Sequence, residues 1–120
     1  ADVGEIADRA VRALKREGFA QGSCIAAVGA GLSRYVESAK GADVNIVVDG
    51  CPVGCARKIM ENIGITPVSY IVTEMGFAKG SSPANPEAIE TVYRNIKEGK
   101  TGAQKSVGGS GCGCGCSGSG

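Results

Sequence analysis

Histidine and tryptophan are absent from this 120-residue chain, and aromatic residues make up only 4% of it. Without histidine, a Ser-His-Asp triad, a Cys-His pair and an imidazole metal ligand are all excluded. Proton transfer would have to use carboxylates, lysine, tyrosine or thiols. A tight site for a soft metal ion would have to be built mainly from sulfur.

The chain also lacks an excess of charge of either sign. Its 13 basic and 12 acidic residues give a formal net charge of +1. Such a balance gives no electrostatic reason to expect nucleic acid or an acidic membrane surface as a partner. The apolar runs are far shorter than the roughly 20 residues that a membrane-spanning helix needs. We therefore expect no nucleic-acid and no membrane partner, and the sequence identifies no protein partner.

What the chain does contain is cysteine, in two different settings. Three cysteines alternate with glycine near the carboxyl terminus, and three lie in a regular α/β pattern. The first group is Cys112, Cys114 and Cys116, and the second is Cys24, Cys51 and Cys55. An odd number of thiols in a domain that can build its own core does not fit a secreted disulfide scaffold. We expect a cytoplasmic protein that uses its thiols for metal binding or chemistry.

Helical and extended segments alternate through the first 99 residues. Hydrophobic spacing predicts helices over 3–14, 32–39, 53–63 and 85–99, and strands over 23–27, 44–48 and 68–73. The β-branched run 44–48 is typical of an interior strand. The pattern predicts a small three-layer α/β domain with a short, mostly parallel sheet, of Rossmann-like or flavodoxin-like type. Because a helix opens the chain before any strand, we expect the sheet to lack a first strand.

Composition divides the chain into two parts. Residues 1–99 are expected to form the α/β domain, and residues 100–120 a disordered tail rich in glycine, serine and cysteine. The thiols of the tail are suited to capturing a soft metal ion. A twelve-residue flexible linker spans roughly 20 Å, so Cys112 could reach a site on the domain.

The segment Asp49-Gly50-Cys51-Pro52-Val53-Gly54-Cys55 carries the strongest chemical signal. It begins at the end of a predicted strand and opens a predicted helix. Ligands of α/β sheets gather at the carboxyl ends of strands, and a helix N-terminus favours thiolates. Cys-x-x-x-Cys falls within the usual spacing of paired metal ligands. The local pattern fits either a pair of zinc ligands or a reactive redox pair.

Four segments of the chain resemble the DGC-domain family of proteins inferred to bind zinc. They are 24–32, 36–43, 46–58 and 72–76, and the third contains the Asp-Gly-Cys sequence for which the family is named. The resemblance runs from Ala1 to about Gly99. It implies metal chelation by four cysteines, three of which correspond to Cys24, Cys51 and Cys55. The fourth would lie in a Cys-Ser-Gly segment just before Ala1.

Two functions follow as hypotheses. In the first, Cys24, Cys51 and Cys55 bind zinc, and the sequence does not identify the fourth ligand. Asp49 either orients the turn or accepts a hydrogen bond from a group next to the ligands, without binding the metal itself. This hypothesis requires the strand 23–27 to end at about Cys24 or Ile25, which would bring the Cys24 sulfur near the sulfurs of Cys51 and Cys55. In the second, the chain is a thiol redox or sulfur-transfer enzyme with Cys51 as nucleophile and Cys55 as resolving thiol.

Overall fold

The computed structural model describes residues 2–99, and the predictions made for the tail lie outside these residues. Helices and strands follow one another as α1 (Asp2–Arg16), α2 (Ile25–Gly29), α3 (Ser33–Gly41), β1 (Ile46–Asp49), α4 (Cys55–Asn62), β2 (Val68–Ile71), the 3₁₀ helix η1 (Val72–Met75) and α5 (Pro86–Glu98). The two strands pair in parallel, from Ile46 beside Val68 to Asp49 beside Ile71. The predicted small α/β domain with a short parallel sheet is confirmed.

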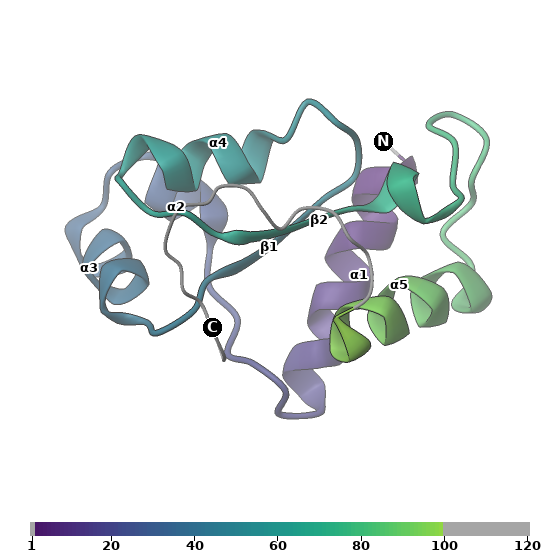
Figure 1. The fold of residues 1–120 in the computed structure, drawn as a ribbon, viewed down its shortest axis with the longest axis horizontal. Coiled ribbons are helices and arrows are strands. Elements are labelled where there is room, and N and C mark those ends of the chain that lie inside the picture. The colour runs from purple at the N-terminus through teal and green to yellow at the C-terminus, as the bar shows by residue number, and fades with distance from the viewer. Residues whose placement is uncertain (1, 100–120) are drawn as a thin grey trace.

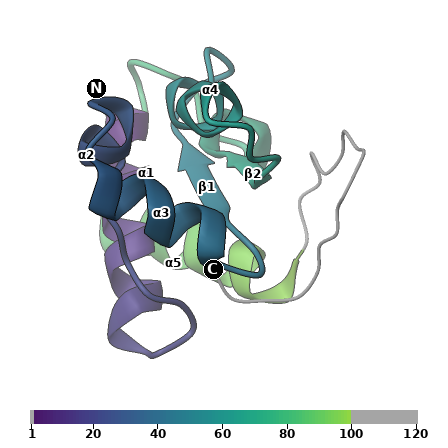
Figure 2. The ribbon, with the colours of Figure 1, turned by 90° about the vertical axis from the view of Figure 1, so that its left-hand side faces the viewer.

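Helices cover both faces of this sheet (Figures 1 and 2). Helices α1 and α5 pack together on one face, where β1 contributes Ile46 and Val48. On the other face Val47 is buried against Met60 of α4, together with residues of α2 and α3. Successive side chains of a strand point to opposite faces, so the β-branched run fills two cores at once. The arrangement is the expected three layers.

Amphipathic periodicity explains the two long helices. In α1, Val3, Ile6 and Ala10 recur on one face and are at most 1% exposed. In α5, Val92 and Ile96 turn inward and are at most 2% exposed. The helix α5 begins where the Asn85 side chain accepts a hydrogen bond from the Ala88 N–H at 2.8 Å. These two helices form most of the larger hydrophobic core.

The predicted strand over 23–27 is wrong. Cys24 has an extended backbone, but the chain then turns into helix α2, with the Ala27 and Val28 N–H groups bonding to the Cys24 carbonyl. Alanine favours helices and is depleted in strands, which explains the outcome for Ala26 and Ala27. A short apolar run does not distinguish the two structures by periodicity.

The prediction that 44–48 forms an interior strand is wrong for the described residues. β1 has β2 on one side, and no strand among residues 2–99 pairs with its other edge. The Asn45 carbonyl accepts the Val68 N–H, so residues 45, 47 and 49 direct their backbone groups toward β2. Because these directions alternate along a strand, Ile46 and Val48 direct theirs toward the open edge.

Candidate functional site at the carboxyl end of the sheet

Asp49, the last residue of β1, holds the beginning of helix α4 in place. Its side chain accepts hydrogen bonds from the Ala56 N–H at 2.8 Å and the Arg57 N–H at 3.2 Å. The residue is only 7% exposed. A carboxylate at this point satisfies two of the N–H groups that a helix leaves unpaired, and it lies at the positive end of the helix dipole. Asp49 therefore fixes the turn that carries Cys51 and Cys55.

Gly50 is required by the close approach of α1. A Cβ at this position would lie 2.8 Å from the Gly4 nitrogen, 2.8 Å from the Val3 carbonyl carbon and 3.0 Å from the Val3 oxygen. All three are backbone atoms of the first turn of α1, which cannot move aside as a side chain would. The absence of a side chain therefore lets the end of β1 pack directly on α1.

Cys51 and Cys55 stand at the two ends of one tight turn. The Gly54 N–H donates to the Cys51 carbonyl at 3.2 Å, and Cys55 is the first residue of α4. Gly54 has φ +67°, a left-handed conformation that glycine adopts without strain. Both thiols are free. Asp49, Gly50 and Gly54 thus each have a separate structural reason in this turn.

Cys51 lies beneath the loop that follows η1. It is half-buried against the core formed by α1 and α5, and the Lys79 ammonium lies 3.9 Å from its sulfur. The carboxylate of Asp2, at the start of α1, anchors this loop by accepting the N–H groups of Gly80 and Ser82, each at 2.9 Å. These hydrogen bonds, the Ser82 one first, lower the pKa of Asp2 to about 2. Asp2 thereby positions the residue next to Lys79.

Cys55 faces a different environment. It is exposed and lines a slot of about 450 Å³ that runs along the open edge of β1. Residues of α1, among them Gly4 and Ala7, form one wall, and residues of α4, among them Ala56, form the other. Ile25 of α2 also borders the slot. Cys55 therefore lies where the sheet has an unpaired edge.

Cys24 is exposed and immediately precedes α2, and its neighbours Ser23 and Ile25 line the same slot as Cys55. Within residues 2–99, however, no three Cys, Asp or Glu side chains are grouped so that they could hold a metal ion. The described part of the chain thus brings Cys51 and Cys55 to one turn with Asp49 and places Cys24 at the border of the adjoining slot.

Sequence reasoning missed the role of Asp2. The spacing of Asp2 and Glu5 is that of a local capping box. The Asp2 carboxylate does accept a hydrogen bond from the adjacent Val3 N–H, but it also accepts the N–H groups of Gly80 and Ser82, which lie 78 and 80 residues further along the chain. No local pattern could reveal that contact. The position of Lys79 follows from the same anchored loop.

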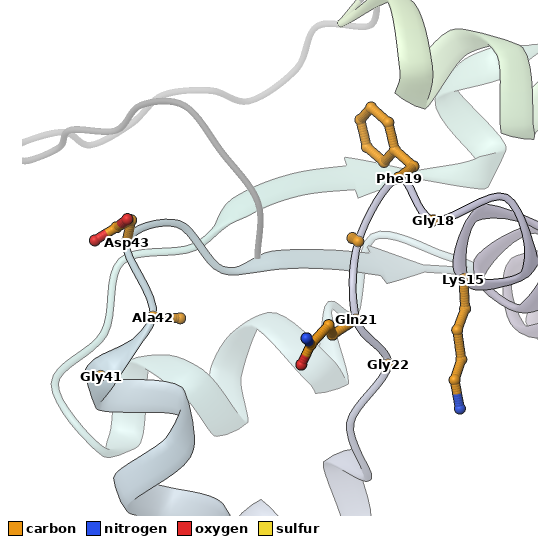
Figure 3. Close-up of a pocket in the computed structure, with 9 residues that line it drawn as sticks. Lys15, Gly18, Phe19, Gln21, Gly22, Gly41, Ala42 and Asp43 are labelled. Atoms are coloured by element: carbon orange, nitrogen blue, oxygen red, sulfur yellow. The ribbon is translucent and has the colours of Figure 1, made fainter.

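A larger hollow, of about 750 Å³, shares Gln21 and Gly22 with the slot (Figure 3). It opens between the loop after α1 and the turn before β1, with Phe19 and Ala42 among its lining residues. Lys15 and Asp43 are the charged residues that line it, and they stand apart in Figure 3. No thiol lines this hollow, so the chemistry of the chain points to the carboxyl end of the sheet.

The comparisons with known proteins give one match. The family model described as DGC domain matches residues 1–96. Comparison with curated proteins gave no match, and comparison with solved structures gave none either. Every helix within residues 2–99 is too short or too polar to span a bilayer.

Proposed function

Because this chain belongs to the DGC-domain family, and carries the Asp-Gly-Cys sequence at 49–51, we propose that it binds zinc through cysteine thiolates. Cys51 and Cys55 are the first ligands, and Cys24 is the third. The observation that supports the proposal is the geometry of the turn. Asp49 accepts a hydrogen bond from the start of α4, and Gly50 lets the turn pack on α1, so that two free thiols are held at the start of a helix.

The donor set fits zinc better than harder metal ions. Zinc accepts thiolate ligands at about 2.3 Å, whereas magnesium and calcium require oxygen ligands. The chain has no histidine, so thiolate is the only soft donor present in quantity. Asp49 already accepts two backbone N–H groups, so we assign it the orientation of the turn rather than a place among the ligands.

Zinc titration of protein purified without oxygen and metal tests this proposal. We expect one zinc ion per chain when a coloured chelator competes for the metal. Cys51→Ser and Cys55→Ser should each weaken binding by roughly 100-fold, because a tetrahedral thiolate site loses one of its charged donors. Lys58→Ala, an exposed change on the same helix, is the control. Binding that survives the double cysteine variant unchanged would exclude the site.

A second candidate function has its own supporting observation. The Lys79 ammonium beside the Cys51 sulfur, at 3.9 Å, places a positive charge where a nucleophilic sulfur would carry a negative one. Cys51 would attack a substrate disulfide and release one thiolate. Cys55 would then displace the second thiol and leave a Cys51–Cys55 disulfide, so that one disulfide is exchanged for another.

The two candidates differ in what Lys79 does. If Cys51 is a nucleophile, Lys79→Met should slow its reaction with a small aromatic disulfide, and Cys55→Ser should trap the mixed disulfide with Cys51. Lys58→Met provides the matched control. A zinc site predicts instead that bound zinc protects both thiols from the reagent, and that Lys79→Met leaves the stoichiometry of zinc unchanged.

A further inference from the structure

The fold places an amine beside the Cys51 sulfur. The Lys79 nitrogen lies 3.9 Å from that sulfur, although the two residues are 28 positions apart in the sequence. No other side chain within residues 2–99 forms a hydrogen bond with it. Cys51 is half-buried, so a small oxidant still reaches its sulfur. A nucleophilic nitrogen is therefore next to a thiol that can be oxidised.

Hydrogen bonds fix the backbone on both sides of Lys79. On one side, the Ala78 N–H donates to the Ser82 hydroxyl, and that hydroxyl donates to the Ala78 carbonyl, both at 2.8 Å. On the other side, the Gly80 N–H donates to the Asp2 carboxylate at 2.9 Å. Ser82 is only 8% exposed, so water competes little for these bonds. The Lys79 side chain thus extends from a fixed point of the backbone.

The second thiol of the turn has different surroundings. Cys51 packs against the core formed by α1 and α5, whereas Cys55 lines the slot along the open edge of β1. Cys51 is not among the residues that line this slot. An oxidised, electrophilic sulfur at Cys51 therefore meets the Lys79 nitrogen before it meets the Cys55 thiol.

We propose that Cys51 and Lys79 form a covalent sulfur–nitrogen bond when the protein reacts with hydrogen peroxide. The Cys51 thiolate attacks one peroxide oxygen and becomes a sulfenic acid, and the other oxygen leaves as hydroxide, which takes up a proton. The unprotonated Lys79 nitrogen then attacks the sulfur, the S–O bond breaks, and water leaves with a proton from the nitrogen. One thiol, one amine and one peroxide give one sulfenamide and two water molecules, and the sulfur loses the two electrons that the peroxide gains.

The bond would be reversible, and it would compete with metal binding. A small thiol attacks the sulfur and releases the amine, and a second one then restores the Cys51 thiol. A sulfur bonded to nitrogen is no longer a thiolate, so oxidation would also remove Cys51 from the ligands of a metal ion. This last consequence rests on the zinc binding proposed above, but the bond itself does not.

Peptide mapping of the zinc-free full chain, before and after treatment with hydrogen peroxide, tests the bond. We expect a pair of peptides joined through Cys51 and Lys79, about 2 Da lighter than the separate peptides, with Cys55 still open to alkylation. Trypsin does not cut after a substituted lysine, so cleavage after Lys79 should be lost in the same fraction of chains. Dithiothreitol should restore that cleavage.

The variant Lys79→Arg separates the charge of Lys79 from its nucleophilic amine. Arginine keeps a positive charge beside the sulfur, so Cys51 should still be oxidised, but the sulfenic acid has no amine to react with. Trapping of that acid at Cys51 by a cyclic diketone should rise at least about fivefold over the unaltered chain. Lys58→Arg, at an exposed position of α4, is the matched control and should behave like the unaltered chain.

The outcomes for the bond are separate from those for zinc. A disulfide between Cys51 and Cys55, or any other cysteine, in place of the bond to Lys79 would overturn the inference. Equal trapping in Lys79→Arg and in the unaltered chain would overturn it as well. Because these measurements use zinc-free protein, their failure leaves the proposed zinc binding standing, and a failure to bind zinc leaves the bond standing.

Discussion

Replacing Gly50 with alanine should destabilise the domain through one contact. The new Cβ would lie 2.8 Å from two backbone atoms of α1, against the 3.5–4.0 Å at which carbon atoms pack without repulsion. Either the end of β1 or the first turn of α1 must move by about 1 Å. Overpacking of this kind costs about 1–3 kcal/mol. Alanine also restricts the unfolded chain, which offsets about 0.4–1 kcal/mol.

The net loss should be about 1–2 kcal/mol, which for a domain of this size lowers Tm by roughly 4–16 °C. Reversible urea unfolding of reduced, zinc-free protein measures it without interference from the metal. Gly41→Ala is the matched control, because a Cβ at Gly41, the last residue of α3, would meet nothing within 4 Å. A Gly50→Ala protein as stable as Gly41→Ala would refute the argument that α1 packs directly on the Asp-Gly-Cys turn.

Three further predictions follow from the packing and charges. Asp49→Ala leaves two N–H groups of α4 unpaired and should cost about 1–2 kcal/mol in urea unfolding, whereas Asp43→Ala, at an exposed site, should cost less than about 0.5. Ile6→Ala removes a side chain that is 0% exposed and should lower the free energy of unfolding by about 2–5 kcal/mol. Leu32→Ala, at 51% exposure, should lower it by less than about 1 kcal/mol. Equal decreases for the two variants would contradict the described core. Because the pKa of Asp2 is lowered from 3.8 to about 2, its stabilising effect should be complete above pH 4 and decline as the pH falls toward 2. Asp2→Asn should reduce that part of the acid dependence, and an unchanged pH profile would count against the anchoring of the loop.

Much of the fold could be predicted because the helices carry their own signals. The apolar face of α1 and the cap and proline that begin α5 act locally, and both predictions were confirmed. The strand β1 was recognised from its β-branched residues. The segment 23–27 was not, because the periodicity of a short run of cysteine, isoleucine and alanine fits either structure; its alanines favour the helix α2, which packs against α3 and α4.

The candidate site likewise has a local part that the sequence predicts and a long-range part that it does not. The Asp-Gly-Cys sequence indicates a turn at the end of a strand, and its local geometry follows from that position. The contacts that surround it are long-range: the backbone of α1 excludes a side chain at Gly50, and Asp2 anchors the loop that brings Lys79 to Cys51. Such contacts depend on how elements that are distant in the sequence pack together, so they cannot be predicted from the spacing of residues.

X-ray absorption at the zinc edge tests zinc binding by these thiolates most directly. Applied to the zinc-loaded full chain, it counts the sulfur ligands and measures their distance. Thiolate coordination by Cys24, Cys51 and Cys55 predicts at least three sulfur atoms at about 2.3 Å. A first coordination sphere of oxygen or nitrogen alone, with all three cysteines still free to react with a thiol reagent, would contradict the zinc site.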